Sequence, residues 1–129
     1  MAPPLPAAVI FEAMNSRDLS LLDPHLSDDV RFDFPGSGVI TGKKRVLVFL
    51  KALLRKYPDI AFSIQDVITG DDKFCVVWTN TARLDTPRPY RNSGITLVRC
   101  AGNRITFISD YFKDTSFVNP SGFAAPQSP

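Results

Sequence analysis

The carboxylate with the most unusual surroundings in the sequence is Asp110, which lies in a strand-like run between Ile108 and Phe112. Side chains alternate along a strand, so an Asp110 that points inward shares its face with these two apolar residues. Burial among apolar groups raises the pKa of a carboxylate toward the range useful for moving protons near neutral pH. We therefore predict that Asp110 is a general acid or base; the alternative is a structural Asp satisfied by the backbone or by an arginine.

Asp33 and Asn80 are the other polar residues that could take part in such chemistry. Asp33 alternates with Phe32 and Phe34, so it either enters the same cavity or faces water. Two carboxylates in one apolar cavity would have pKa values that move apart, giving one acid and one base. The Asn80 amide can donate to a carbonyl or orient a water. Both residues join Asp110 in the predicted catalytic set.

A second group of residues is predicted to bind the substrate. Trp78 shares a strand face with Asn80 and can form a wall of the pocket, or else belong to the core. Arg31 stands on the same strand face as Asp33, where it could pair with that carboxylate or bind an oxyanion; a surface position is the alternative. The predicted substrate-binding residues are Trp78, Arg31, Phe34, Phe49, Asn92 and Phe112.

Composition restricts the remaining classes of function. The net charge is +2, and the one basic run, residues 43–45, lies at a predicted helix start, so we expect no nucleic-acid partner. The single histidine cannot build a His-rich metal site, and neither a metal nor another cofactor is predicted. The two cysteines are far apart in sequence, which favours a reducing compartment. Without a span-length apolar stretch or a secretory signal, we expect a cytoplasmic protein that does not enter a membrane.

The order of the predicted elements indicates one α+β domain. Two helical segments come first, then a short strand, a long amphipathic helix, and four long strands joined by short turns. Such strands predict an antiparallel meander, and a bent sheet with the long helix across its concave face is the economical packing. The predicted helices cover residues 7–16, 19–22 and 43–57, and the strands cover 30–34, 60–69, 74–84, 90–100 and 104–112. Residues 1–6 are a predicted flexible arm, 7–118 the domain and 119–129 a flexible tail.

Five pieces of sequence in this order resemble the SnoaL-like domains of the NTF2-like superfamily. They are Phe11-Glu-Ala-Met-Asn-Ser-Arg-Asp18 with Leu26-Ser-Asp-Asp-Val30, Thr41-Gly42, Trp78-Thr-Asn-Thr-Ala-Arg-Leu84, Pro89-Tyr-Arg-Asn-Ser-Gly94 and Ile108-Ser-Asp-Tyr-Phe112. The resemblance implies an NTF2-like cone, in which a strongly curved, mainly antiparallel sheet wraps around a long helix and encloses an apolar pocket. It also implies a homodimer through the outer sheet face, onto which Tyr111 should point.

Ketosteroid isomerases of this superfamily use a Tyr on the first helix and two Asp residues on strands. Ungapped matching places Ile10, Phe34 and Ile95 at those positions. All three are apolar, so the sequence lacks the proton-moving carboxylate and the oxyanion donors of that reaction.

Limonene-epoxide hydrolases use an Asp–Arg–Asp set, of which only the last Asp is matched, by Asp110. The Arg and the other Asp fall on Asn80 and Ala82, and the assisting Tyr and Asn fall on Arg31 and Asp33. Epoxide opening would therefore need a rearranged site.

SnoaL-type cyclases resemble this chain best in chemistry, because they rely on a buried Asp in an apolar pocket. The predicted function is a cofactor-independent isomerase, cyclase or dehydratase that acts on a small apolar metabolite of polyketide or terpenoid type. The alternatives are a non-catalytic ligand-binding or dimerisation module, and an epoxide hydrolase with a rearranged site.

Overall fold

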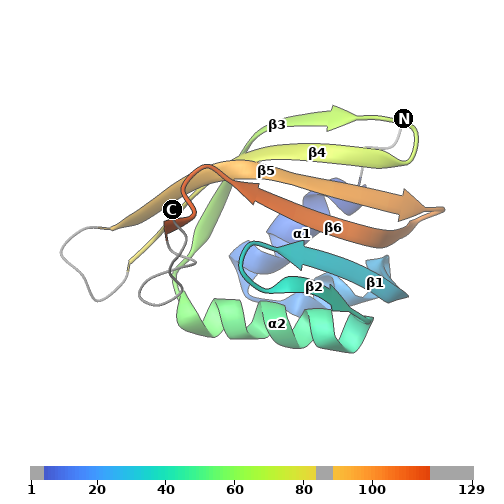
Figure 1. The fold of residues 1–129 in the computed structure, drawn as a ribbon, viewed down its shortest axis with the longest axis horizontal. Coiled ribbons are helices and arrows are strands. Elements are labelled where there is room, and N and C mark those ends of the chain that lie inside the picture. Colours follow the sequence, from blue (N-terminus) through green and yellow to red (C-terminus); the bar gives the residue numbers. More distant parts are fainter. Residues whose placement is uncertain (1–4, 84–88, 117–129) are drawn as a thin grey trace.

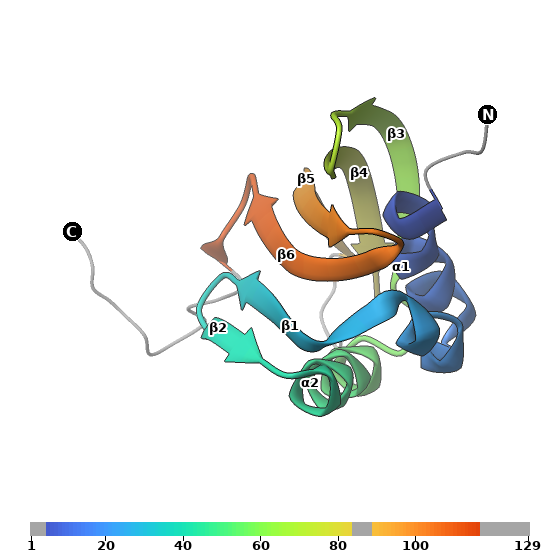
Figure 2. The same cartoon turned by 90° about the vertical axis from the view of Figure 1, so that its right-hand side faces the viewer.

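Six strands form one curved sheet in the order β2-β1-β6-β5-β4-β3 (Figure 1). The computed structural model describes residues 5–83 and 89–116. Helices α1 (Leu5–Ser16) and α2 (Lys43–Lys56) close the concave side of the sheet, α1 against β3 to β5 and α2 against β1 and β2 (Figure 2). The strands are β1 (Leu26–Phe34), β2 (Gly38–Thr41), β3 (Ala61–Thr69), β4 (Lys73–Ala82), β5 (Tyr90–Ala101) and β6 (Arg104–Phe112). The predicted α+β cone is confirmed.

The second half of the chain is the predicted antiparallel meander, because β3, β4, β5 and β6 pair in sequence order. The first half differs from the prediction in two respects. Strand β1 begins at Leu26, earlier than predicted, and pairs in parallel with β6. Strand β2 occupies a segment without a predicted strand; it pairs antiparallel with β1 at the edge of the sheet. Its short, largely exposed run carries no alternation from which a strand could be predicted.

Helix α1 begins at Leu5, so the predicted arm over residues 1–6 is wrong at its last two residues. Pro6 lies in the first turn, where a helix has no internal use for the missing backbone N–H. Between the two long helices lie the short 3-10 turns η1 (Leu19–Leu21) and η2 (Asp23–His25). Residues 1–4 of the predicted arm and the predicted tail over 119–129 lie outside the described residues.

Helix α2 follows its sequence pattern. Val46 and Leu50 are buried on the side that faces the sheet, and Lys51 and Arg55 are exposed on the other. The helix stops before Pro58, whose ring disfavours a helical conformation in the residue before it. Across residues 5–83 and 89–116, neither long helix has the length and apolar character needed to cross a bilayer.

Alternation along the central strands gives the sheet an inner face and an outer face. On β4, Val76, Trp78, Asn80 and Ala82 are buried, while the residues between them are partly or fully exposed. The core therefore lies inside the curve of the sheet, together with one buried amide. That amide belongs to Asn80 and marks the cavity described next.

Candidate functional site

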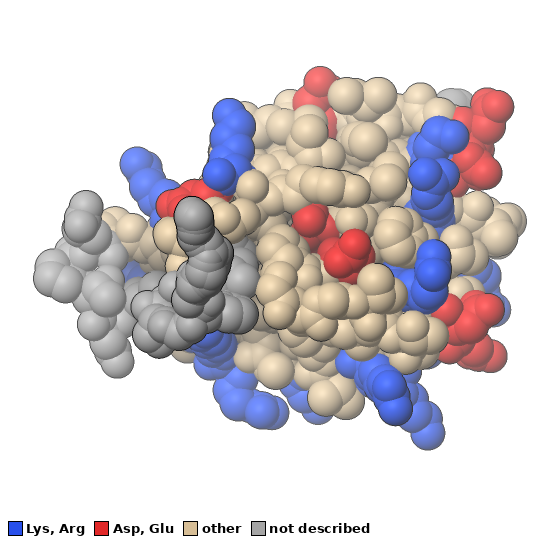
Figure 3. All heavy atoms as spheres, viewed as in Figure 1, with Lys and Arg blue, Asp and Glu red and all other residues tan. Residues whose placement is uncertain are grey.

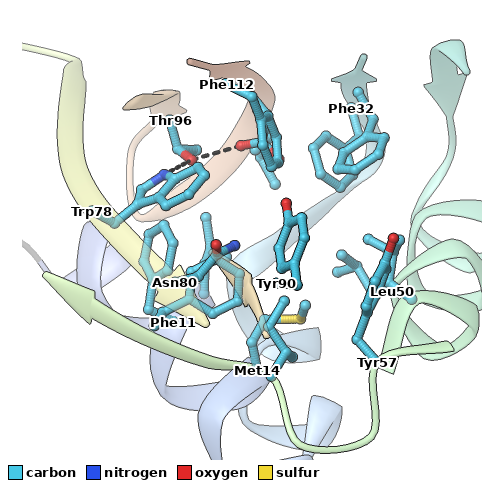
Figure 4. Close-up of a pocket in the computed structure, with 17 residues that line it drawn as sticks. Phe11, Met14, Phe32, Leu50, Tyr57, Trp78, Asn80, Tyr90, Thr96 and Phe112 are labelled. Atoms are coloured by element: carbon cyan, nitrogen blue, oxygen red, sulfur yellow. Dashed lines mark hydrogen bonds between the residues drawn. The ribbon is translucent and has the colours of Figure 1, made fainter. Parts of the chain in front are cut away.

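A cavity of about 50 Å³ lies between the concave face of the sheet and the two long helices (Figure 4). Its walls are mostly rings and aliphatic chains, and Asp110 is the one carboxyl group among the described lining residues. The lining consists of Ile10, Phe11, Met14, Phe32, Phe34, Leu50, Leu53, Tyr57, Ile60, Phe62, Trp78, Asn80, Tyr90, Thr96, Ile108, Asp110 and Phe112. This lining combines an apolar interior with a few polar groups, as small-molecule sites commonly do.

Asp110 reaches the cavity from β6, on the same face as Ile108 and Phe112, as the alternation predicted. Its strand partner across the ladder is Thr96 on β5. The Thr96 hydroxyl donates to Oδ1 of Asp110 over 2.6 Å, and the Trp78 indole Nε1 donates to Thr96 Oγ1 over 2.9 Å. Figure 4 shows this chain of two hydrogen bonds along one side of the cavity.

The direction of this chain follows from the chemistry of its first member. An indole N–H can only donate, so Thr96 Oγ1 accepts from Trp78 and its single hydroxyl hydrogen is directed to Asp110. Oδ1 of Asp110 is therefore an acceptor, and the other carboxyl oxygen is left to take up and release a proton. Trp78 and Thr96 together fix the orientation of the carboxyl group.

Burial raises the pKa of Asp110 from 3.8 to about 7. The hydrogen bond from Thr96 acts in the opposite direction, and the negative charge of Asp33 on the neighbouring strand adds to the rise. The residue is half-buried, and the apolar side chains that line the cavity around its carboxyl group limit the contact of that group with water. A carboxyl group with this pKa exchanges protons readily near neutral pH.

Gly94 lets the Trp78 indole lie against β5. The two residues are partners in the ladder, and a Cβ on Gly94 would lie 2.9 Å from Trp78 Cζ2 and would overlap the backbone oxygen of Tyr111. Only glycine leaves this space open. The position of the hydrogen-bond donor to Thr96 therefore depends on the absence of a side chain at residue 94.

Asn80 lies at a different end of the cavity from Asp110. It pairs with Asn92, whereas Thr96, the partner of Asp110, pairs with Val76. Asn80 lies four positions after Val76, about 13 Å along an extended strand. Asn80 therefore lines the same cavity as Asp110 from a position further along the strand, and its predicted role in polarising the reacting oxygen stays a prediction.

Asp33 and Arg31 do not enter the cavity. Phe32 and Phe34 occupy the inner face of β1, with their rings 5.9 Å apart, so the residues that alternate with them point to the outer face. Arg31 lies over the ring of Phe107 at 5.2 Å. The prediction that both residues belong to the pocket is wrong, because burial of two large apolar rings is favourable, whereas burial of an aspartate and an arginine would cost the hydration of their charges.

Phe49 and Asn92 lie one layer behind the cavity wall. The ring of Phe49 packs edge-on against Phe32 and Phe34 without lining the cavity. Asn92 donates from Nδ2 to the hydroxyl oxygen of Tyr90 over 2.9 Å. Neither residue takes the predicted place in the wall, whereas the predicted Trp78, Phe34 and Phe112 do line it.

Sequence reasoning missed Thr96 and Tyr90. Tyr90 lines the cavity, and burial raises its pKa, while its side-chain interactions with Asn92 and Asn80 act against the rise. Both could have been predicted from the alternation of side chains along β5, because residues 90, 94, 96 and 98 share the inner face of this strand. Knowledge of the strand register was needed to see that Thr96 would meet Asp110.

The model of the SnoaL-like domain family matches residues 8–108 of this sequence. The chain belongs to the SnoaL-like family. The matched segment spans both long helices and most of the sheet, and it ends just before Asp110 in this SnoaL-like domain. No functionally curated protein matches the sequence significantly.

Solved structures extend the likeness of this SnoaL-like domain to the whole fold. An NTF2-like protein of unknown function from Burkholderia pseudomallei K96243 superposes with a TM-score of 0.80 at 20% identity, covering 96% of this chain and 100% of that one. The candidate polyketide cyclase IdmH from Streptomyces antibioticus superposes with a TM-score of 0.75 at 19% identity, covering 87% and 93%. A candidate SnoaL-like polyketide cyclase from Jannaschia sp. CCS1 gives 0.75 at 13% identity, covering 84% and 83%. The superpositions show a shared fold.

Proposed function

We propose that this SnoaL-like domain is a cofactor-independent isomerase, cyclase or dehydratase for a small apolar metabolite of polyketide or terpenoid type. The observation that carries the proposal is the Asp110 carboxyl group, whose pKa is raised to about 7 by burial in an apolar cavity. The likeness to proteins described as candidate polyketide cyclases supports the substrate class.

The proposed chemistry is proton transfer at a carbon next to a carbonyl group. The ionised Asp110 takes a proton from that carbon, and the electron pair moves onto the carbonyl oxygen to give an enolate. The protonated Asp110 then returns the proton to another atom of the same molecule, so no cofactor or net acid is consumed. Thr96 holds one carboxyl oxygen, and the surrounding rings keep bulk water away from the intermediate.

Deuterium exchange tests this proposal without knowledge of the natural substrate. Small apolar ketones are incubated with the protein in deuterated buffer, and incorporation next to the carbonyl is followed by mass spectrometry. We expect the wild-type protein to accelerate exchange and Asp110→Asn to reduce that acceleration by about 10²- to 10⁴-fold, the usual contribution of a general base. Asp33→Asn is the matched control, since Asp33 lies on the other face of the sheet; it should retain most of the exchange.

A non-catalytic ligand-binding module is the second candidate, favoured by the largely apolar lining of the cavity. If Asp110→Asn binds the ketones as the wild-type protein does and neither protein accelerates exchange, the domain binds without catalysing.

We also propose a homodimer that forms through the outer face of the sheet. Large apolar side chains are exposed there, including Val39 at 52%, Ile68 at 57% and Tyr111 at 60%. Figure 3 shows this face: uncharged residues cover most of it, a few acidic atoms lie near its centre, and basic side chains lie toward its edges. A two-fold interface places the same surface on both subunits, and a face with acidic and basic groups at different places can complement itself.

Sedimentation of two variants tests the dimer. Ile95 pairs with Tyr111 on this face and is 39% exposed. Ile95→Glu would place one negative charge from each subunit in the proposed interface and is therefore expected to give a monomer. Val48→Glu changes an apolar residue of α2 that is 68% exposed and should leave the dimer intact. A monomeric wild-type protein at tens of micromolar would rule the interface out.

A further inference from the structure

The Asn80 side chain carries a buried polar atom without a protein partner. Asn80 is 3% exposed, and its Oδ1 accepts no hydrogen bond from any described residue. A buried amide oxygen of this kind costs stability unless another molecule donates to it. Asn80 lines the cavity, and Figure 4 shows its amide turned into the space between Trp78 and Tyr90.

The two polar atoms of this amide call for different partners, because Nδ2 can only donate and Oδ1 can only accept. The Asn80 side chain is close enough to the Tyr90 hydroxyl to lower the pKa of Tyr90, as a donor to the phenol oxygen does. Asn92 donates to the same oxygen over 2.9 Å. The Oδ1 atom is left as an acceptor, and a ligand must meet it with an O–H or N–H group.

The surroundings of Asn80 distinguish between these donors. Phe62, the ladder partner of Asn80, is aromatic, and so are Phe11 and Trp78, which contact the Phe62 ring at 5.4 Å each. A buried ammonium group would need a nearby negative charge to offset its loss of water. Asp110, the one lining carboxylate that the structure describes, lies at the other end of the cavity. A neutral hydroxyl group on an apolar body can donate to Oδ1, fits the aromatic surroundings and needs no negative charge nearby.

We infer that Asn80 Oδ1 binds a hydroxyl group of the ligand, so that the domain selects an apolar ring compound with an alcohol, phenol or enol oxygen remote from the carbon that reacts at Asp110. This inference rests on the proposed function in using the same cavity and assigns a substrate class to it. The ligand lies with its hydroxyl at Asn80, its apolar body against Trp78 and Phe112, and its reacting part beside Asp110. Asn80 is a specificity residue and touches no reacting atom.

Binding of phenol and fluorobenzene tests the inference, because the two probes have nearly the same shape and only phenol donates a hydrogen bond. Affinities are measured by NMR titration for the wild-type protein, Asn80→Leu and Asp110→Asn. We expect Asn80→Leu to lower the affinity for phenol by about tenfold, which is the effect of losing one hydrogen bond. The affinity for fluorobenzene should stay unchanged or increase. Asp110→Asn should keep the preference for phenol. A wild-type crystal soaked with phenol should show the phenol oxygen within hydrogen-bond distance of Asn80 Oδ1.

Three results would overturn the inference. They are a phenol affinity that is equal in the wild type and Asn80→Leu, a phenol preference lost only in Asp110→Asn, and absence of phenol binding by the wild-type protein. The soaked crystal tests the inference even if Asn80→Leu does not fold, since a phenol oxygen bonded to Asp110 instead would also contradict it. The proposed function is tested separately by deuterium exchange, so either can fail while the other stands.

Discussion

Raising the pH from about 5 to about 8 is expected to lower the free energy of unfolding of the wild-type protein, and Asp110→Asn is expected to remove most of this loss. The pKa of Asp110 is about 7 in the folded protein against 3.8 for an ordinary Asp, so between these values the folded state binds more protons than the unfolded state. The stabilisation is complete below the lower value and is lost as the pH passes the upper one. Between pH 5 and pH 8 the expected loss is on the order of 3 kcal/mol, because about two of the roughly three pH units between the two pKa values lie in this window.

Urea unfolding at several pH values measures this effect. The wild-type curve should fall with pH, and the Asp110→Asn curve should be flatter, since asparagine keeps the shape and can still accept from Thr96. The pKa of Asp114 is lowered by hydrogen bonds from Ser116, so its contribution changes at lower pH, outside this window. Curves that run parallel in the two proteins would show that Asp110 does not titrate in the range we assign.

Two substitutions of Thr96 test what sets the pKa of Asp110. Its hydrogen bond lowers the pKa of Asp110, so Thr96→Val should move the titration of the carboxyl group, followed by carbon NMR, to higher pH. Thr96→Ser retains a hydroxyl that can accept from Trp78 and should titrate close to the wild type. An Asp110 that titrates equally in both variants would exclude the hydrogen-bond chain as a determinant of its pKa.

Gly94→Ala is expected to destabilise the fold by about 3 kcal/mol, the upper range for overpacking in a core. The new Cβ would meet a backbone oxygen of Tyr111 and the rigid indole of Trp78, neither of which can move aside easily. Displacement of Trp78 would also break its bond to Thr96, so the titration of Asp110 should change with the stability.

Gly70→Ala is the matched control for this substitution. A Cβ at Gly70 would meet the flexible side chain of Lys73 at 3.2 Å, which can give way, so a small effect on urea unfolding is expected. Equal unfolding free energies for Gly94→Ala and the wild type would show that Trp78 does not need this space.

The long strands of the meander were predictable because alternation and short turns mark them in the sequence. The inward position of Asp110 was predictable from the same alternation, because Ile108 and Phe112 on either side of it are apolar and share its strand face. Alternation separates the two faces of a strand without saying which one is buried, and for this reason Asp33 was placed wrongly. The partnership of Thr96 with Asp110 depends on the register between β5 and β6, which composition and spacing do not carry.

The rings around the cavity have a consequence for the kinetics of ligand entry. Phe34, Phe112 and Trp78 stand edge to face with centroids 5.5 and 5.0 Å apart, beside a hollow of about 50 Å³. That hollow is smaller than the roughly 300 Å³ typical of a metabolite site. A ligand of metabolite size can enter only after some of these rings have rotated. The observed association rate should therefore level off as ligand concentration rises, at the frequency with which the aromatic cluster opens by itself.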